Sequence, residues 1–164
     1  MNTLFNINDN LLEPLFSPNS VAILGASRTP GKVGHDILTN LLSSGFTGRI
    51  IPVNPAGGEL FDFPVIKQLS DYKGRVDLAV ITVPLHHVLA SAKVAIKKGA
   101  RAIIVITAGF REVGDEGIRL EAELLEICHQ GGARLLGPNC LGLINTENNL
   151  NASFANKMPM EGPI

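Results

Sequence analysis

The sequence predicts an α/β domain in which a doubly wound parallel sheet carries helices on both faces. Short apolar runs alternate with amphipathic helical stretches, the joins between them are short, and the apolar runs are continuous. Strands without polar alternation are buried on both faces, which is typical of a parallel sheet covered by helices. The length of 164 residues fits a single domain of this Rossmann-like kind.

Each element follows from local patterning. Apolar residues at helical spacing predict the helices, and glycines such as Gly45 and Gly99 stand where helix C-terminal caps belong. Leu143 and Ile144 are a candidate start for a sixth strand. The expected order is strand 20–24, helix 31–44, strand 49–53, short helix 67–72, strand 76–83, helix 85–98, strand 102–107, helix 115–130 and strand 134–136.

The ends of the chain differ in character from its middle. Residues 1–14 are expected to be an N-terminal extension, and residues 15–146 the domain itself. The stretch from 145 to 156 holds five Asn in twelve residues, which is too little apolar content to close a domain. Residues 147–164 are therefore predicted to be a linker toward a downstream domain that this chain lacks.

Composition excludes several classes of function. A net charge of −1 argues against a general nucleic-acid binder. The longest apolar stretches reach about half of a membrane span, and the N-terminus lacks the basic region of a secretory signal. Cys128 and Cys140 form no disulfide framework and no metal spacing, so we expect no metal site and a cytoplasmic location.

Ligands of open parallel sheets bind outside the carboxyl ends of the strands. The loop after the first strand is Gly-rich, running from Gly25 to Gly34, and such a loop lets backbone N–H groups and a helix N-terminus approach a phosphate. Arg28 and Lys32 add positive charge. The alternative is that the glycines only make a tight turn and close helix–strand packing.

The same loop departs from the dinucleotide fingerprint. Ser27 stands in place of the second glycine, and Asn54 stands where an acid would hold the ribose hydroxyls of NAD. The fold therefore favours a nucleotide ligand, whereas the fingerprint speaks against NAD.

Other reactive side chains favour structural interpretations. His86 and His87 open a helix, and one of them is a conceivable base or phosphate ligand, but an exposed pair is the simpler interpretation. No base is identifiable beside Cys140. The acids near the 115–130 helix fit a solvated helix face better than a catalytic pair.

Five ordered motifs resemble a known family. They are similar to the N-terminal CoA-binding domain of ADP-forming acyl-CoA (acetyl-CoA) synthetases, which is related to the succinyl-CoA synthetase α subunit. The resemblance covers residues 11 to about 156. The motifs are Leu15–Ser27, Gly45–Gly48, Pro52–Pro55, Ile106–Gly109 and Leu136–Gly142.

This resemblance implies that CoA or acyl-CoA binds at the carboxyl ends of the strands. The Gly137–Gly142 segment, which includes Asn139, is similar to the family segment near the reactive end of the cofactor. The other residues implied are Gly25, Ser27, Arg28, Thr29, Pro30, Lys32, Val33 and Gly34 in the first loop, then Val53, Asn54, Pro55, Val83, Pro84, Ile106, Thr107 and Ala108.

Two positions depart from the family pattern, because Ala108 replaces an acid and Gly57 replaces a lysine. The family's chemistry passes through an acyl phosphate and a phosphohistidine, on a flavodoxin-like domain with an ATP-grasp partner. No histidine of this chain lies in a matching segment, so no catalytic residue is assigned here.

Three interpretations follow. The resemblance favours the CoA-binding domain of an ADP-forming acyl-CoA synthetase, a ligase whose activity requires the downstream flavodoxin-like and ATP-grasp parts. The alternatives are the CoA-binding part of a protein lysine acetyltransferase and a stand-alone CoA- or nucleotide-binding regulatory module. The acyl substrate, the use of ATP or GTP, and homo-oligomerisation are left open.

Overall fold

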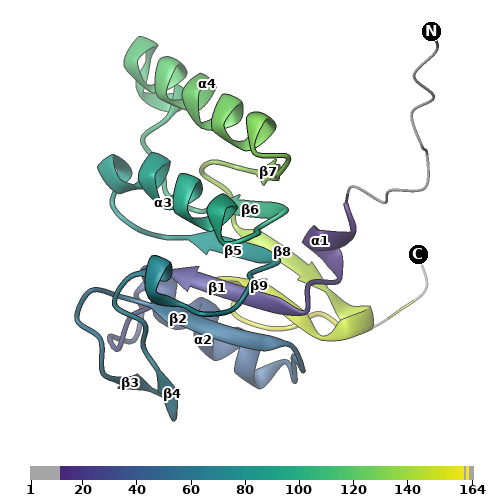
Figure 1. The fold of residues 1–164 in the computed structure, drawn as a ribbon. Coiled ribbons are helices and arrows are strands. Elements are labelled where there is room, and N and C mark those ends of the chain that lie inside the picture. The colour runs from purple at the N-terminus through teal and green to yellow at the C-terminus, as the bar shows by residue number, and fades with distance from the viewer. Residues whose placement is uncertain (1–11, 161, 163–164) are drawn as a thin grey trace, which may run out of the picture.

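A computed structural model describes residues 12–160 and 162 of the chain, and its centre is a five-stranded parallel sheet (Figure 1). Every neighbouring pair of strands is parallel, in the order β2-β1-β5-β6-β7. The chain leaves β1 toward one edge of the sheet and returns to its other side, so the direction of winding reverses between β1 and β5. The strands are β1 (Ser20–Leu24), β2 (Arg49–Val53), β5 (Leu78–Ile81), β6 (Ala102–Val105) and β7 (Arg134–Leu136).

Helices cover both faces of the sheet, as the sequence predicts. α2 (Val33–Ser43) lies on one face, and α3 (Leu85–Lys97) and α4 (Asp115–Gln130) lie on the other (Figure 1). The strands β1, β5 and β6 are buried along their whole length, which confirms that continuous apolar runs mark a two-sided sheet. Gly99, at φ +98°, follows α3 and takes the left-handed conformation expected of a C-terminal cap.

Short elements decorate this core. A hairpin of β3 (Glu59–Leu60) and β4 (Phe63–Pro64) follows β2 and precedes a 3-10 turn over Leu69–Asp71, which replaces the short helix expected at 67–72. A further 3-10 turn over Arg111–Val113 precedes α4, and α1 (Glu13–Phe16) precedes β1.

The predicted linker contains a buried strand. β8 (Gly142–Asn145) and β9 (Leu150–Ser153) form an antiparallel hairpin around a 3-10 turn at Thr146–Asn148. Leu150 and Ala152 have no exposed surface and pack in the same apolar cluster as α2 and β6. The boundary expected at 146 is therefore too early, and the candidate strand at 143–144 belongs to this hairpin rather than to the main sheet.

The predicted N-terminal extension lies mostly outside the described residues, since the description begins at residue 12. Within the described part, Glu13 and Pro14 begin α1, and Leu15 is buried in the cluster beneath α2. No helix in that part is long and apolar enough to cross a membrane.

Candidate functional site

A cleft of about 880 Å³ opens at the carboxyl ends of β1, β2 and β5, where the winding of the sheet reverses. This is the place where open α/β sheets bind ligands, and the volume lies in the range of small-molecule and cofactor sites. Its predicted lining residues come from the loops after all three strands: Gly25, Ser27, Lys32, Val33, Gly34, Val53, Asn54, Pro55, Val83 and Pro84.

The first loop turns sharply over the ends of β1 and β2. Gly25 adopts φ +100°, and the N–H groups of Gly25 and Ala26 donate to the carbonyl oxygen of Val53. Thr82 donates its hydroxyl to the carbonyls of Leu24 and Gly25, and a Cβ on Gly25 would lie 2.5 Å from that hydroxyl oxygen. The first glycine is therefore required by both conformation and space.

The start of α2 packs directly on this turn. A Cβ on Gly34 would collide with the carbonyl group of Gly25, so only glycine lets the helix come this close. The packing role considered for these glycines is therefore real, and it also places the first turn of α2 at the wall of the cleft.

That first turn offers free hydrogen-bond donors. Within the described residues, the N–H groups of Val33 and Gly34 have no acceptor, whereas those of His35 and Asp36 donate to the carbonyl of Lys32. Lys32 itself lines the cleft and carries the formal charge. Free amides, the positive end of the helix and a lysine are together the kind of arrangement that can hold an anion.

The side chain of Asn54 joins the loop after β2 to the loop after β1 by hydrogen bonds. Its amide nitrogen donates to the carbonyl of Ala26, and its amide oxygen accepts from the N–H of Ala56, both at 2.8 Å. The side chain is thus used to hold the loop after β2 against the loop after β1. A carboxylate could not replace both contacts, because it has no hydrogen to donate.

Several predicted residues lie at the same edge of the sheet but do not line the cleft. Arg28 is exposed, and its guanidinium donates to the carbonyl of Gly57 at 2.5 Å. Thr107 donates its hydroxyl to the carbonyl of Val83 and accepts at its own carbonyl from the N–H of Asn139, so the loops after β5, β6 and β7 are joined. The rest of this group is Thr29, Pro30, Ile106 and Ala108.

Sequence reasoning missed the segment after β4. Lys67, Gln68 and Ser70 line the cleft beside Asn54 and Pro55. Ile66 pairs in parallel with Val53, so this segment acts as a short extra strand at the β2 edge, and the residues after it come to the carboxyl edge like those after any other strand. A run of apolar residues at 63–66 is the only signal in the sequence that could have pointed to it.

Comparison with known proteins identifies the family. Residues 19–146 match the sequence model of the CoA binding domain family. The chain belongs to this family. Coenzyme A is therefore the cofactor whose shape and charge are compared with the cleft.

Two curated relatives of this CoA-binding domain are ADP-forming acetate–CoA ligases. The chain is 41% identical to the α subunit of the Pyrococcus furiosus ligase I over 93% of its length, and 44% identical to the Methanocaldococcus jannaschii ligase over 95%. It spans only 34% and 22% of those two proteins.

A solved structure agrees with this likeness. The dinucleotide forming acetyl-coenzyme A synthetase 1 of Ca. Korarchaeum cryptofilum, in complex with phosphate and ADP, aligns with a TM-score of 0.88 at 43% identity. The alignment covers 92% of this chain and 32% of that structure. The expected family and fold are thus confirmed, and the chain corresponds to about a third or less of these longer proteins.

The residues of the cleft fit coenzyme A. The free amides at the start of α2 suit a phosphate, and the walls are otherwise largely apolar, with Val33, Val53, Leu69, Val83 and Val94 among them. A nucleotide with a long, uncharged arm suits a cleft that combines places for anions with an extended, largely apolar surface.

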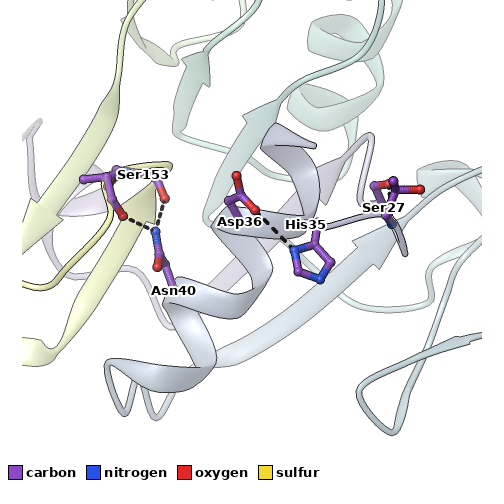
Figure 2. Close-up of polar contacts among 7 residues, drawn as sticks. Ser27, His35, Asp36, Asn40 and Ser153 are labelled. Carbon is purple, nitrogen blue, oxygen red and sulfur yellow. Dashed lines mark hydrogen bonds and ion pairs between the residues drawn. The ribbon is translucent and has the colours of Figure 1, made fainter. Parts of the chain in front are cut away.

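The histidines and cysteines give no catalytic arrangement among the described residues. His87 lines the cleft from α3, while His86 does not, and both are exposed. His35 contacts Asp36 at 3.2 Å, but Ser27 lies apart from this pair and accepts a hydrogen bond from the N–H of Thr29 (Figure 2). Burial raises the pKa of the Cys140 thiol, which lies 3.5 Å from the carbonyl of Val105. In the described part of the chain no group of acids, histidines and cysteines could hold a metal ion.

Proposed function

We propose that this chain is the CoA-binding domain of an ADP-forming acyl-CoA synthetase. In the full protein, a carboxylic acid such as acetate, CoA and ATP would give the acyl-CoA, ADP and phosphate. The observation that carries the proposal is the cleft at the β1/β5 reversal, in a chain whose relatives of 41% and 44% identity are acetate–CoA ligases of this type.

Different residues of the cleft are proposed to bind different parts of coenzyme A. The N–H groups of Val33 and Gly34, with Ser27 and Lys32, would hold a phosphate, since they combine free donors with positive charge. The apolar side chains of Val53, Val83 and Pro84 would contact the uncharged parts of the cofactor. Coenzyme A supplies the thiol that accepts the acyl group.

The loops after β6 and β7 complete the carboxyl edge of the sheet. Thr107 and Asn139 are hydrogen-bonded to each other through their backbones and lie beyond the cleft. With Ile106 and Ala108 they are proposed to guide the arm of the cofactor toward its reactive end. They would do so by the shape of the backbone, because the Thr107 hydroxyl already donates to Val83.

The chemical steps are proposed to need parts outside this chain. The chain spans only 34% and 22% of its two relatives, and the described residues bring no histidine into a catalytic arrangement. We propose flavodoxin-like and ATP-grasp domains or subunits as the partners. Reading the gene beyond the Ile164 codon, and the genes beside it, tests this: a flavodoxin-like or ATP-grasp region in either place supports it, whereas an acetyltransferase domain downstream, or neither region in either place, contradicts it.

Calorimetric titration of the purified chain tests the binding function. CoA and acetyl-CoA should bind at one site, and NAD should bind much more weakly. The variant Lys32→Met should weaken CoA binding, while Lys97→Met, at an exposed lysine near the end of α3, should not. NAD binding that equals or exceeds CoA binding would overturn the proposal.

A further inference from the structure

Lys67 lies where a side chain of residue 57 would otherwise be. A Cβ built on Gly57 would be 2.9 Å from Cε of Lys67 and 3.1 Å from its Cγ. The lysine stem therefore runs across the face of this glycine, and a larger residue at position 57 would displace it. Gly57 also has φ +62°, a conformation that other residues rarely adopt.

Hydrogen bonds hold the turn from Asn54 to Gly57 on which this lysine stem lies. The N–H of Gly57 donates to the carbonyl of Asn54, the N–H of Ala56 donates to the side chain of Asn54, and the carbonyl of Gly57 accepts from Arg28. These three hydrogen bonds hold the turn from Asn54 to Gly57 and so support the Gly57 surface on which the lysine stem lies.

The backbone of Lys67 is fixed as well. Ile66 donates its N–H to the carbonyl of Pro52 and accepts at its carbonyl from the N–H of Asn54, which holds the segment to the edge of β2. Lys67 follows directly, at the carboxyl edge. Its ammonium group has no hydrogen-bond or ion-pair partner among the described residues, and the neighbouring amide of Gln68 has none either.

The cleft therefore carries two separate cationic places. One is the start of α2 with Lys32, and the other is Lys67 with Gln68, on a different wall built by the segment at the β2 edge. Coenzyme A also carries its negative charge in two places, the pyrophosphate bridge and the 3′-phosphate of the ribose. Two phosphate groups at separate points of one cofactor could therefore use both places.

We infer that Lys67, assisted by the side-chain amide of Gln68, binds the 3′-phosphate of coenzyme A, and that the pyrophosphate takes the start of α2. This inference rests on the proposed function. Lys67 then supplies from the segment after β4 the positive charge that residue 57 does not carry. The cleft selects CoA over nucleotides that lack the 3′-phosphate.

The test compares CoA with 3′-dephospho-CoA by calorimetry. The wild-type chain should prefer CoA. Lys67→Met keeps most of the aliphatic stem and removes the charge, so it should weaken CoA binding about five- to tenfold and leave 3′-dephospho-CoA binding unchanged. Lys67→Arg should keep the preference, and Lys73→Met, at an exposed lysine outside the cleft, should change nothing.

The outcomes separate the inference from the function on which it rests. If Lys67→Met weakens both ligands equally, or neither, the assignment of the 3′-phosphate is wrong. Equal binding of the two ligands by the wild-type chain would also overturn it, while leaving CoA binding itself intact. If the wild-type chain binds neither ligand, the proposed function fails. Thermal unfolding of each variant checks that the fold is kept.

Discussion

The guanidinium of Arg28 donates a hydrogen bond to the carbonyl oxygen of Gly57 and so ties the loop after β1 to the loop after β2. Asn54 makes a second tie between the same loops through the carbonyl of Ala26. These loops are two walls of the cleft. Arg28 therefore acts on the cleft by holding its walls together, since its own side chain does not line it.

Arg28→Ala should weaken CoA binding while the fold stays intact. Loss of one hydrogen bond from a charged donor at an exposed site is worth about 1 kcal/mol, which corresponds to about a fivefold change in the dissociation constant. Calorimetry with CoA measures it, and circular dichroism checks the fold. Arg119→Ala, at an exposed position of α4, is the control. An unchanged dissociation constant would show that the Arg28 hydrogen bond does not affect CoA binding. An unfolded variant would show that Arg28 is needed for the fold.

Gly34→Ala should disturb both stability and binding. The added Cβ would run into the carbonyl group of Gly25, so α2 must shift away from the first loop. Overpacking of this kind costs about 1–3 kcal/mol. The measurement is urea unfolding together with CoA titration.

Gly31→Ala is the matched control for this variant. Gly31 also has a positive φ, +78°, but nothing lies within 4 Å of the place where its Cβ would be. It should lose only about 1 kcal/mol through backbone strain and keep its affinity for CoA. Equal effects of the two variants would mean that the contact of α2 with Gly25 does not position the anion site.

Asn54→Asp should not create a site for NAD. The substitution places a carboxylate oxygen against the carbonyl of Ala26 and removes the donor between them, which should cost about 1–3 kcal/mol of stability. CoA binding should weaken because the loops separate. Thermal unfolding and titration with CoA and NAD measure these effects. A stable variant that gains NAD binding would show that Asn54 is only a specificity residue.

Much of the fold and half of the cleft could be predicted from sequence. Strands buried on both faces are continuous apolar runs, and the rule that ligands bind after such strands led directly to Gly25, Val53 and Val83. The predicted strand 76–83 is longer than β5, because β5 ends at Ile81, which is paired with the last residue of β6. Apolar character continues beyond the ladder, so it cannot mark the end of a strand.

Lys67 could not be predicted in the same way. The segment before it is short and contains Pro64. It lies parallel to β2 because the turn at Asn54–Gly57 and the β3–β4 hairpin together return the chain to that edge. This pairing is a property of the assembled sheet. The asparagines from residue 145 onward led to the wrong prediction of a linker for a related reason. Several of them are turn and hydrogen-bonding residues of the β8–β9 hairpin. Asn149 has φ +57°, and Asn145 and Asn148 donate to the carbonyl of Phe16.

Both thiols should react slowly in the folded chain. Burial raises the pKa of the Cys128 thiol to about 11, and it also raises the pKa of Cys140. Since the thiolate is the nucleophile, alkylation by iodoacetamide at pH 8 should be much slower than in urea. Rapid labelling of Cys128 under native conditions would contradict this.

The raised pKa of the Cys128 thiol also predicts how the free energy of unfolding changes with pH. The folded state keeps the Cys128 proton at a pH where the unfolded chain releases it. The unfolded state therefore binds fewer protons between pH 9 and pH 11, and stability should fall as the pH rises through this interval. Cys128→Ala should flatten that part of the profile. A wild-type profile without this decline would show that the thiol ionises as easily in the folded chain.

Leu150→Ala should show that the domain extends past residue 146. Leu150 has no exposed surface and packs with α2 and β6, so truncation should cost about 2–5 kcal/mol. In a flexible linker the same change would cost nothing. Phe154→Ala, at a residue that is 36% exposed just after β9, should cost much less. Because Asn40 of α2 donates to the carbonyls of Ser153 and Ala155, Asn40→Ala should also destabilise the hairpin (Figure 2). Urea unfolding of the three variants measures these differences. If Leu150→Ala were as stable as the wild type, β9 would not be part of the packed domain.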